Sequence, residues 1–150
     1  MNRDEVWVGT DPIDIARVAA SVHDEALGGV GMFLGRVRSP NGGHVIHHLD
    51  YEGYEDMILA TMSAIADELR AEHGGDAERM LVAIYHRLGR LLPGEVSLAV
   101  AIATPHRATA LAACAAAVEK LKRRLPVWKQ EVDDAGSRYV TGTSVAGEVL

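Results

Sequence analysis

The segment EVSLAVAIAT, residues 95–104, alternates large apolar side chains with small ones. Successive side chains of a β-strand point to opposite faces of the sheet, so the large residues at positions 96, 98, 100 and 102 share one face. Serine and alanine cover the other face. We therefore predict that this segment is a strand. Another element is expected to pack closely against its face of small side chains.

The segments on both sides of this strand predict further strands and helices. Apolar residues at intervals of three and four predict helices after Asp14, over residues 54–73 and between Pro105 and Pro126. Other strands are expected at residues 6–8, 30–38, 45–52, 79–86, 127–133 and 137–140. These elements do not alternate regularly, which favours an α+β fold, an α/β sandwich with a mostly antiparallel sheet and helices packed on it.

Two details of these elements carry structural expectations. Gly31 and Gly35 lie on one side of the strand at residues 30–38, where a missing side chain permits a bulge, a bend or the close approach of a neighbour. The helix that ends before Pro126 is expected to bury one apolar stripe. Its members are Leu111, Cys114, Ala115, Val118, Leu121 and Leu125. Residues 141–150 are weakly patterned.

Length and composition describe a single globular domain, residues 1–150, with 48% hydrophobic and 24% charged residues. No Pro- or Ser-rich linker divides the chain. Cys114 is the only cysteine, which excludes an internal disulfide and any multi-cysteine metal site.

The net charge of −6 argues against a general nucleic-acid binder. No stretch approaches the roughly 20 apolar residues of a membrane span, and the N-terminal segment does not resemble a secretion signal. We therefore expect a cytoplasmic protein that binds neither nucleic acid nor membrane.

Basic residues gather between positions 106 and 129. His106-Arg107 stand at the start of the last helix, where free backbone N–H groups favour a bound anion. Alternatively, Arg107 pairs with a carboxylate and His106 is a neutral, hydrogen-bonded residue. The run 122–124 at the far end either meets the helix dipole in solvent or contributes to a site.

Two lysines of this region are candidates for chemistry. Lys122 lies on the flank of the apolar stripe, so its amine is expected to be partly desolvated and able to act as an acid or base. Lys129 shares one side of a strand with Val127 and Glu131, and Glu131 is its simplest salt-bridge partner. Arg36 and Arg38 either add to the same site or belong to the surface.

Other motifs give weaker signals. His44, His47 and His48 do not complete a metal-ligand pattern, and alternation separates His47 from His48. The glycine-rich stretches match neither dinucleotide-binding nor P-loop spacing, and Cys114 fits a core position better than a nucleophile. No metal and no cofactor are expected.

The ordered set of motifs resembles the large, catalytic subunit of molybdopterin synthase. These motifs are GMFLGRVR (31–38), LDYEGY (49–54), HRLG (86–89), PGE (93–95), HR (106–107) and LKRRLPVWKQE (121–131). The resemblance implies a sulfurtransferase that converts cyclic pyranopterin monophosphate, precursor Z, into molybdopterin by installing two dithiolene sulfurs. It also implies a small ubiquitin-like subunit that delivers sulfur as a C-terminal glycine thiocarboxylate. The chain ends in Gly-Glu-Val-Leu and not in Gly-Gly, so the donor is expected in trans.

The resemblance also assigns functional residues to matching positions. It implies that Lys122 and Lys129 are catalytic and that Arg38, His106 and Arg107 bind the substrate and its phosphate. Arg138 resembles a further basic substrate-binding position. The family relationship implies a homodimer of large subunits with a small subunit at each outer end, a heterotetramer, in which His106-Arg107 serve a shared pocket.

Two non-catalytic functions remain as alternatives. The first is a module that binds the tail of a ubiquitin-like protein, with the lysines pairing with its carboxylate. The second is a regulator that binds a pterin phosphate without any protein donor. Turnover separates the enzyme from both, because a binding module consumes no thiocarboxylate.

Overall fold

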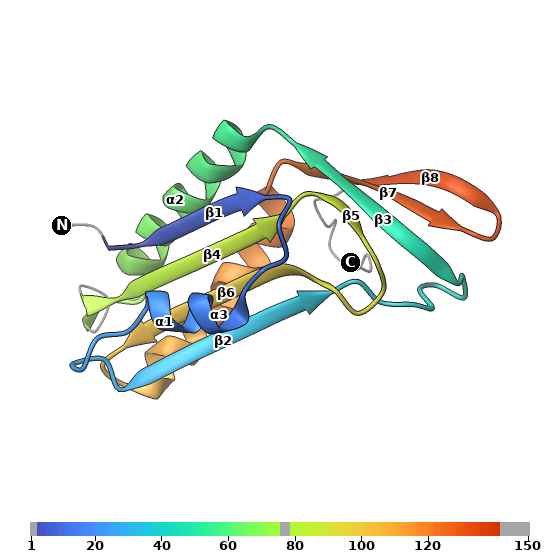
Figure 1. Ribbon diagram of the computed structural model, residues 1–150. Coiled ribbons are helices and arrows are strands. Elements are labelled where there is room, and N and C mark those ends of the chain that lie inside the picture. The colour runs from blue at the N-terminus through green and yellow to red at the C-terminus, as the bar shows by residue number, and fades with distance from the viewer. Residues whose placement is uncertain (1–2, 76–78, 142–150) are drawn as a thin grey trace.

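The computed structural model describes residues 3–75 and 79–141, which form three helices and two four-stranded sheets (Figure 1). The first sheet has the order β1-β4-β6-β2, in which β1 and β4 are parallel and the other pairs are antiparallel. Its strands are β1 (Glu5–Gly9), β4 (Leu81–Arg87), β6 (Val96–Thr104) and β2 (Gly29–Arg36). β2 is therefore an edge strand of this sheet.

The second sheet is antiparallel throughout and has the order β5-β3-β7-β8. Its strands are β5 (Gly89–Leu91), β3 (Ile46–Gly53), β7 (Val127–Asp133) and β8 (Gly136–Thr141). The predicted α+β class with mostly antiparallel strands is confirmed. Residues 142–150, most of the weakly patterned segment, lie outside the described residues.

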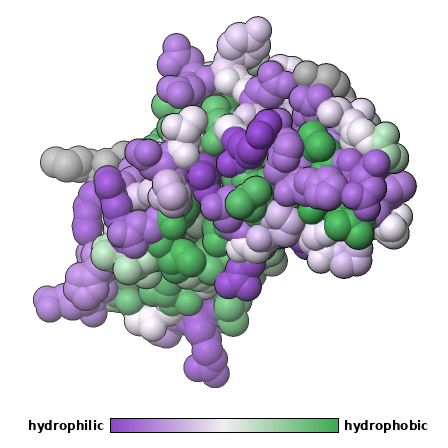
Figure 2. All heavy atoms as spheres, turned by 45° about the vertical axis from the view of Figure 1, so that its right-hand side comes forward, coloured by the Kyte–Doolittle hydropathy of each residue, from purple (hydrophilic) through white to green (hydrophobic). Residues whose placement is uncertain are grey.

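The helices cover both faces of the first sheet. α2 (Glu55–Glu72) and α3 (Arg107–Arg124) lie on one face, and α1 (Ile15–Ser21) lies on the other (Figure 1). No helix in the described ranges is both long and apolar enough to cross a membrane. Figure 2 shows hydrophobic side chains exposed next to strongly hydrophilic ones on one face of the molecule.

Over residues 98–103 the two faces of β6 pack as their side-chain sizes predict, whereas Val96 packs with the cluster around α1, because the register shift inserts Ser97 into the strand. Leu98, Val100 and Ile102 join the main core beneath α2 and α3. The alanines at positions 99, 101 and 103 form a second cluster with Val18 of α1 and Val22, the C-cap residue of that helix. The small face of the strand therefore admits a short helix close to the sheet, which confirms the prediction.

The last helix differs from its prediction in its start and in its buried face. It begins at Arg107, because Thr104 still belongs to β6 and His106 is extended. Its buried face is built on Ala110, Ala113, Cys114, Ala117 and Leu121. Two members of the predicted stripe are instead exposed: Ala115, and Leu111, whose exposed fraction is 59%.

Close packing of α3 on β2 explains this rotation of the buried face. A Cβ atom added to Gly31 would lie 2.8 Å from the carbonyl oxygen of Ala110. Only small residues fit at such a contact, so the alanines face the sheet and Leu111 is left on the flank. The expected close approach at Gly31 is confirmed, and the β2–β6 register also shifts between Gly35 and Arg36.

Candidate active site

A pocket of about 220 Å³ lies where the C-terminal end of α3 meets both sheets. Its polar lining residues are Arg36, Tyr51, His86, Ser97, Lys122 and Lys129. Apolar residues of β2, β6 and α3 complete the wall. The described lining residues include three cations and no carboxylate, so the pocket is electropositive in a protein of net charge −6.

Lys122 reaches this pocket from the last turn of α3. It follows Leu121, which is buried in the main core, and its own side chain is half-buried. Burial lowers the pKa of the Lys122 amine, and the charge of Lys129 lowers it further. The predicted desolvation of Lys122 is confirmed.

Lys129 reaches the same pocket from β7. The strand begins two residues after Leu125, so the short connection at Pro126 brings the second lysine back beside the end of α3. Lys129 is only 4% exposed, and burial lowers the pKa of its amine. The Glu131 carboxylate opposes that effect on the pKa, while the charge of Arg38 adds to it.

The alternation predicted for β7 is confirmed. Lys129 and Glu131 are buried on one face of the strand, and Trp128 is exposed on the other. The β3–β7 register places Tyr51 opposite Lys129, so the two sheet residues meet inside the pocket.

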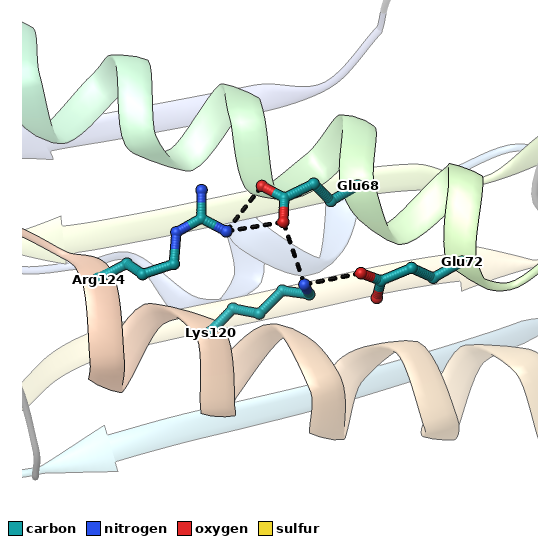
Figure 3. A network of polar contacts seen from close by, with 4 residues as sticks. All are labelled: Glu68, Glu72, Lys120 and Arg124. Carbon is teal, nitrogen blue, oxygen red and sulfur yellow. Dashed lines mark hydrogen bonds and ion pairs between the residues drawn. The ribbon is translucent and has the colours of Figure 1, made fainter.

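The other basic residues near the end of α3 have a structural role. Lys120 Nζ donates to Glu72 Oε1 at 2.8 Å and to Glu68 Oε1 at 3.1 Å, and Arg124 Nη1 donates to both oxygens of Glu68 at 2.7 Å (Figure 3). These ion pairs join α3 to α2. Lys120 and Arg124 therefore hold the two helices together, Lys122 lines the pocket, and Arg123 is exposed.

The structure adds His86 and Tyr51, which the sequence analysis did not single out. His86 Nδ1 lies 2.8 Å from the carbonyl oxygen of Arg87, to which it donates, and this leaves Nε2 as an acceptor. Burial lowers the pKa of His86 to about 4, and the charge of Lys122 contributes to the decrease. The imidazole is therefore neutral at pH 7.

Tyr51 packs edge-on against His86, with ring centroids 5.2 Å apart. Burial raises the pKa of the Tyr51 hydroxyl; a hydrogen bond with Ser97 opposes this rise and the Glu131 charge adds to it. A polar residue at the end of the apolar run 81–85 was the sequence signal for His86. Nothing in the alternation of β3 distinguished Tyr51 from a core residue.

The structure places the remaining predicted residues in three different regions. Arg38 follows β2, is exposed, and donates from Nη2 to Asn41 Oδ1 at 2.9 Å. Its effect on the pKa of Lys129 shows that its charge acts on the pocket. Arg138 lies on β8, with its backbone opposite Glu131.

His106 and Arg107 lie at the opposite end of α3 from the pocket. His106 is the N-cap residue of that helix and Arg107 is its first residue. The rise of 1.5 Å per residue separates position 106 from position 122 by about 24 Å. One chain therefore does not bring these two residues together with Lys122 and Lys129.

The remaining weak candidates also have positions in the structure. His44, His47 and His48 lie 3.4, 2.7 and 3.5 Å from the carboxylates of Asp133, Asp134 and Asp50, respectively. Cys114 is buried, and burial raises the pKa of its thiol, as expected of a core cysteine.

Comparison with known proteins identifies relatives over nearly the whole chain. The family model of the MoaE protein matches residues 8–124. A molybdopterin synthase catalytic subunit of Pyrococcus abyssi is 35% identical over 147 residues, which cover 95% of both chains. One of Drosophila melanogaster is 37% identical over 131 residues, or 87% of this chain, and the match spans 35% of the length of that relative.

A solved structure gives the same result. The crystal structure of molybdopterin synthase from Staphylococcus aureus aligns with this chain with a TM-score of 0.83 and 29% sequence identity. The alignment covers 93% of this chain and 98% of the Staphylococcus aureus chain. Fold and pocket together define an α+β protein with a cationic pocket where its two sheets meet. The chain belongs to the MoaE protein family, the family of molybdopterin synthase catalytic subunits.

Proposed function

We propose that this chain is the catalytic subunit of a molybdopterin synthase. It transfers sulfur from the C-terminal thiocarboxylate of a small ubiquitin-like subunit to precursor Z and so forms the dithiolene of molybdopterin. The observation that carries the proposal is the pair of desolvated lysines, Lys122 and Lys129, in one pocket without a carboxylate lining. The match to the Pyrococcus abyssi catalytic subunit over 95% of both chains supports this choice.

The proposed reaction needs cations for three reasons. An anionic substrate must be held, the carbonyl of the thiocarboxylate must be polarised, and protons must move while sulfur replaces oxygen. A positive group stabilises developing negative charge more strongly in a desolvated pocket than in water. Lys122 and Lys129 lie in such surroundings.

The two lysines have different proposed roles. Lys122 is the principal acid, base or electrostatic catalyst, because its lowered pKa brings proton release closer to neutral pH. Lys129 is more deeply buried and carries the opposing influence of Glu131, so its ammonium orients the donor tail or the intermediate. Arg38 and Arg138 are proposed to bind the substrate.

The anion-binding residues His106 and Arg107 serve the pocket of a second copy of the chain in this proposal. An apolar groove of about 360 Å³ between β2 and α3 includes Met32, Leu111 and Val118, midway between the two ends of the helix. A two-fold axis perpendicular to α3 at this groove would set two α3 helices antiparallel and bring the N-terminal end of one beside the C-terminal end of the other. The assembly is then a homodimer with one small subunit per pocket, a heterotetramer.

The proposed location is the cytoplasm, where the single thiol of Cys114 stays reduced. The reaction itself requires no bound metal or organic cofactor in this scheme, because sulfur arrives on the donor protein.

A single-turnover assay tests the proposed function. Wild-type protein is mixed with precursor Z and the thiocarboxylated small subunit, and dithiolene product and remaining thiocarboxylate are followed by mass spectrometry. We expect product from wild type and a rate lower by about 100-fold or more from Lys122→Ala. Arg123→Ala is the matched control, because Arg123 is the exposed next residue and does not line the pocket.

Two results would contradict the proposal. Binding of the small subunit by wild type without loss of thiocarboxylate would identify a binding module. A Lys122→Ala rate within a few-fold of wild type would remove the assigned role of that lysine.

A further inference from the structure

His86 is a buried polar residue of the pocket that has no assigned role. Side chains alternate along β4, so His86 shares a face with Val82 and Ile84, which pack in the main core beneath α2 and α3. His86 is only 7% exposed, and it lines the pocket together with Leu98, its register partner in β6. The regular geometry of the sheet therefore carries the imidazole to the pocket.

The hydrogen bond at Nδ1 determines what this imidazole offers to its surroundings. A carbonyl oxygen can only accept, so the neutral ring carries its proton on Nδ1, 2.8 Å from the carbonyl oxygen of Arg87. Nε2 then holds a lone pair, and no hydrogen bond to it is found within residues 3–75 and 79–141. A buried acceptor without a donor is costly, so a donor in the pocket is expected to reach it.

Lys122 is the donor that fits this acceptor. It lines the same pocket, and its charge acts on the imidazole, whose pKa it lowers. In the described part of the chain, no hydrogen bond from the Lys122 amine to another group is found. The charge of Lys129, by contrast, is offset by Glu131. The ammonium of Lys122 therefore still needs an acceptor.

The other polar side chains that line the pocket do not supply this acceptor. The hydroxyls of Tyr51 and Ser97 are engaged with each other, and Ser97 also donates to the carbonyl oxygen of Gly35 at 3.3 Å. The remaining lining cations, Lys129 and Arg36, are donors only. Among the described lining side chains, the imidazole is the acceptor that remains.

We propose that His86 is a positioning residue for Lys122, whose ammonium donates a hydrogen bond to Nε2 of the imidazole. A lysine side chain is long and flexible, so this contact fixes one N–H and directs the other two toward the carbonyl of the thiocarboxylate. The inference rests on the proposed function and adds to it a residue that acts through Lys122. His86 itself transfers no proton in this scheme, because its ring stays neutral at pH 7.

NMR titration of the Lys122 amine after reductive ¹³C-methylation tests the inference without any substrate. His86→Phe keeps an aromatic ring beside Tyr51 but has no acceptor. The pKa of Lys122 should fall by about one pH unit in this variant, because a hydrogen bond to an ammonium stabilises its charged form. In His86→Gln an amide oxygen takes the place of Nε2, so the pKa should stay near the wild-type value. Lys120, which lies between the helices, is the internal control and should titrate alike in all three proteins.

The single-turnover assay gives a second readout. The sulfur-transfer rate of His86→Phe should be lower by about tenfold at pH 7, and its pH profile should move to lower pH together with the pKa of Lys122. His86→Gln should recover most of the lost rate. His86→Asn replaces His86→Phe if that variant does not fold, because its shorter amide can still donate to Arg87 but has no acceptor at the position of Nε2.

Two results would overturn the inference. The first is an equal pKa of Lys122 in wild type and His86→Phe. The second is an equal decrease in His86→Phe and His86→Gln, which would assign the effect to the aromatic ring and not to the acceptor. The expected pKa values in a wild-type protein without sulfur transfer would support the contact while contradicting the proposed function.

Discussion

The coupling between Lys122 and Lys129 can be measured directly, because the chain contains only three lysines, at positions 120, 122 and 129. The charge of Lys129 lowers the pKa of Lys122, so Lys129→Gln should raise that pKa. The removal of a neighbouring positive charge makes the protonated amine less unfavourable. Reductive ¹³C-methylation followed by NMR titration reports each amine separately.

The same spectra contain the control for this prediction. Lys120 donates to Glu68 and Glu72 between the helices, so its signal should titrate alike in wild type and Lys129→Gln. If the titration midpoint of the Lys122 signal were no higher in Lys129→Gln than in wild type, the two amines would not be coupled.

His86 predicts a pH dependence of stability. Its pKa of about 4 in the folded protein lies below the ordinary value of 6.5, so between these values the unfolded chain binds more protons than the folded one. Stability should therefore fall as the pH decreases through this window. The His86 contribution to the free energy of unfolding should decrease by about 2 kcal/mol between pH 7 and pH 5.

Urea denaturation of wild type and His86→Gln at both pH values checks this prediction. The variant should lose less stability than wild type on acidification, whatever its stability at pH 7. His23→Gln, at an exposed histidine, is the control and should keep the wild-type difference. An equal loss in wild type and His86→Gln would show that His86 is not a buried neutral group.

The sequence was informative about residues whose local pattern differs from their surroundings. Periodicity indicated that Lys122 flanks an apolar stripe and that Lys129 shares one face of a strand with Val127 and Glu131, whereas the family resemblance supplied their predicted catalytic roles. Their meeting in one pocket depends on the tight connection at Pro126 and on the β3–β7 pairing, which are tertiary features.

At the scale of elements, the contact between β2 and α3 depends on a residue without a side chain. The Cβ of Gly31→Ala would lie 2.8 Å from the carbonyl oxygen and 3.1 Å from the carbonyl carbon of Ala110. Backbone atoms cannot move aside by a rotamer change, so the helix itself must shift. We expect a loss of about 1–3 kcal/mol in the free energy of unfolding, measured by chemical denaturation.

Gly35→Ala is the matched control on the same strand. Its added Cβ would lie 3.3 Å from the ring of Phe33, a side chain that can adjust. The control should therefore be less destabilised than Gly31→Ala. Equal midpoints for Gly31→Ala and wild type would show that α3 does not need this close approach.

Most elements were predicted because their periodicity extends over several residues, and the exceptions have identifiable causes. β5 contains only Gly89–Leu91, and it exists because it pairs with residues 49–51 of β3. The helix expected after Pro105 begins only at Arg107, because Thr104 is still held in β6 and His106 is extended. In both cases tertiary pairing decided what the local sequence left open.

At the scale of the whole molecule, the separation of the predicted site residues is the central feature. His106 and Arg107 cap one end of α3, and Lys122 lies in the last turn at the other end. Arg38 follows β2, and its charge lowers the pKa of Lys129 within the same chain. His106 and Arg107, which are predicted to bind the anionic substrate, can act on this pocket only from a second copy of the chain.

Mixing two inactive variants tests whether the site is shared between copies. One variant carries Lys122→Ala, and the other carries His106→Ala together with Arg107→Ala. In a mixed dimer with a shared site, one pocket collects every substitution and the other collects none. Random exchange of subunits should therefore restore about a quarter of the wild-type sulfur-transfer activity, since half of the dimers are mixed and each has one intact pocket.

The control for this mixture is a pair of variants with substitutions at two residues that one chain supplies to the same pocket. Lys122→Ala mixed with Lys129→Ala should recover no activity, because both lysines of a pocket come from one chain and every pocket keeps one defect. Separate copies with complete sites would give no recovery in either mixture, because each site would then contain the substitution of its own chain. Recovery in the first mixture alone requires that His106-Arg107 of one copy act on the lysines of the other.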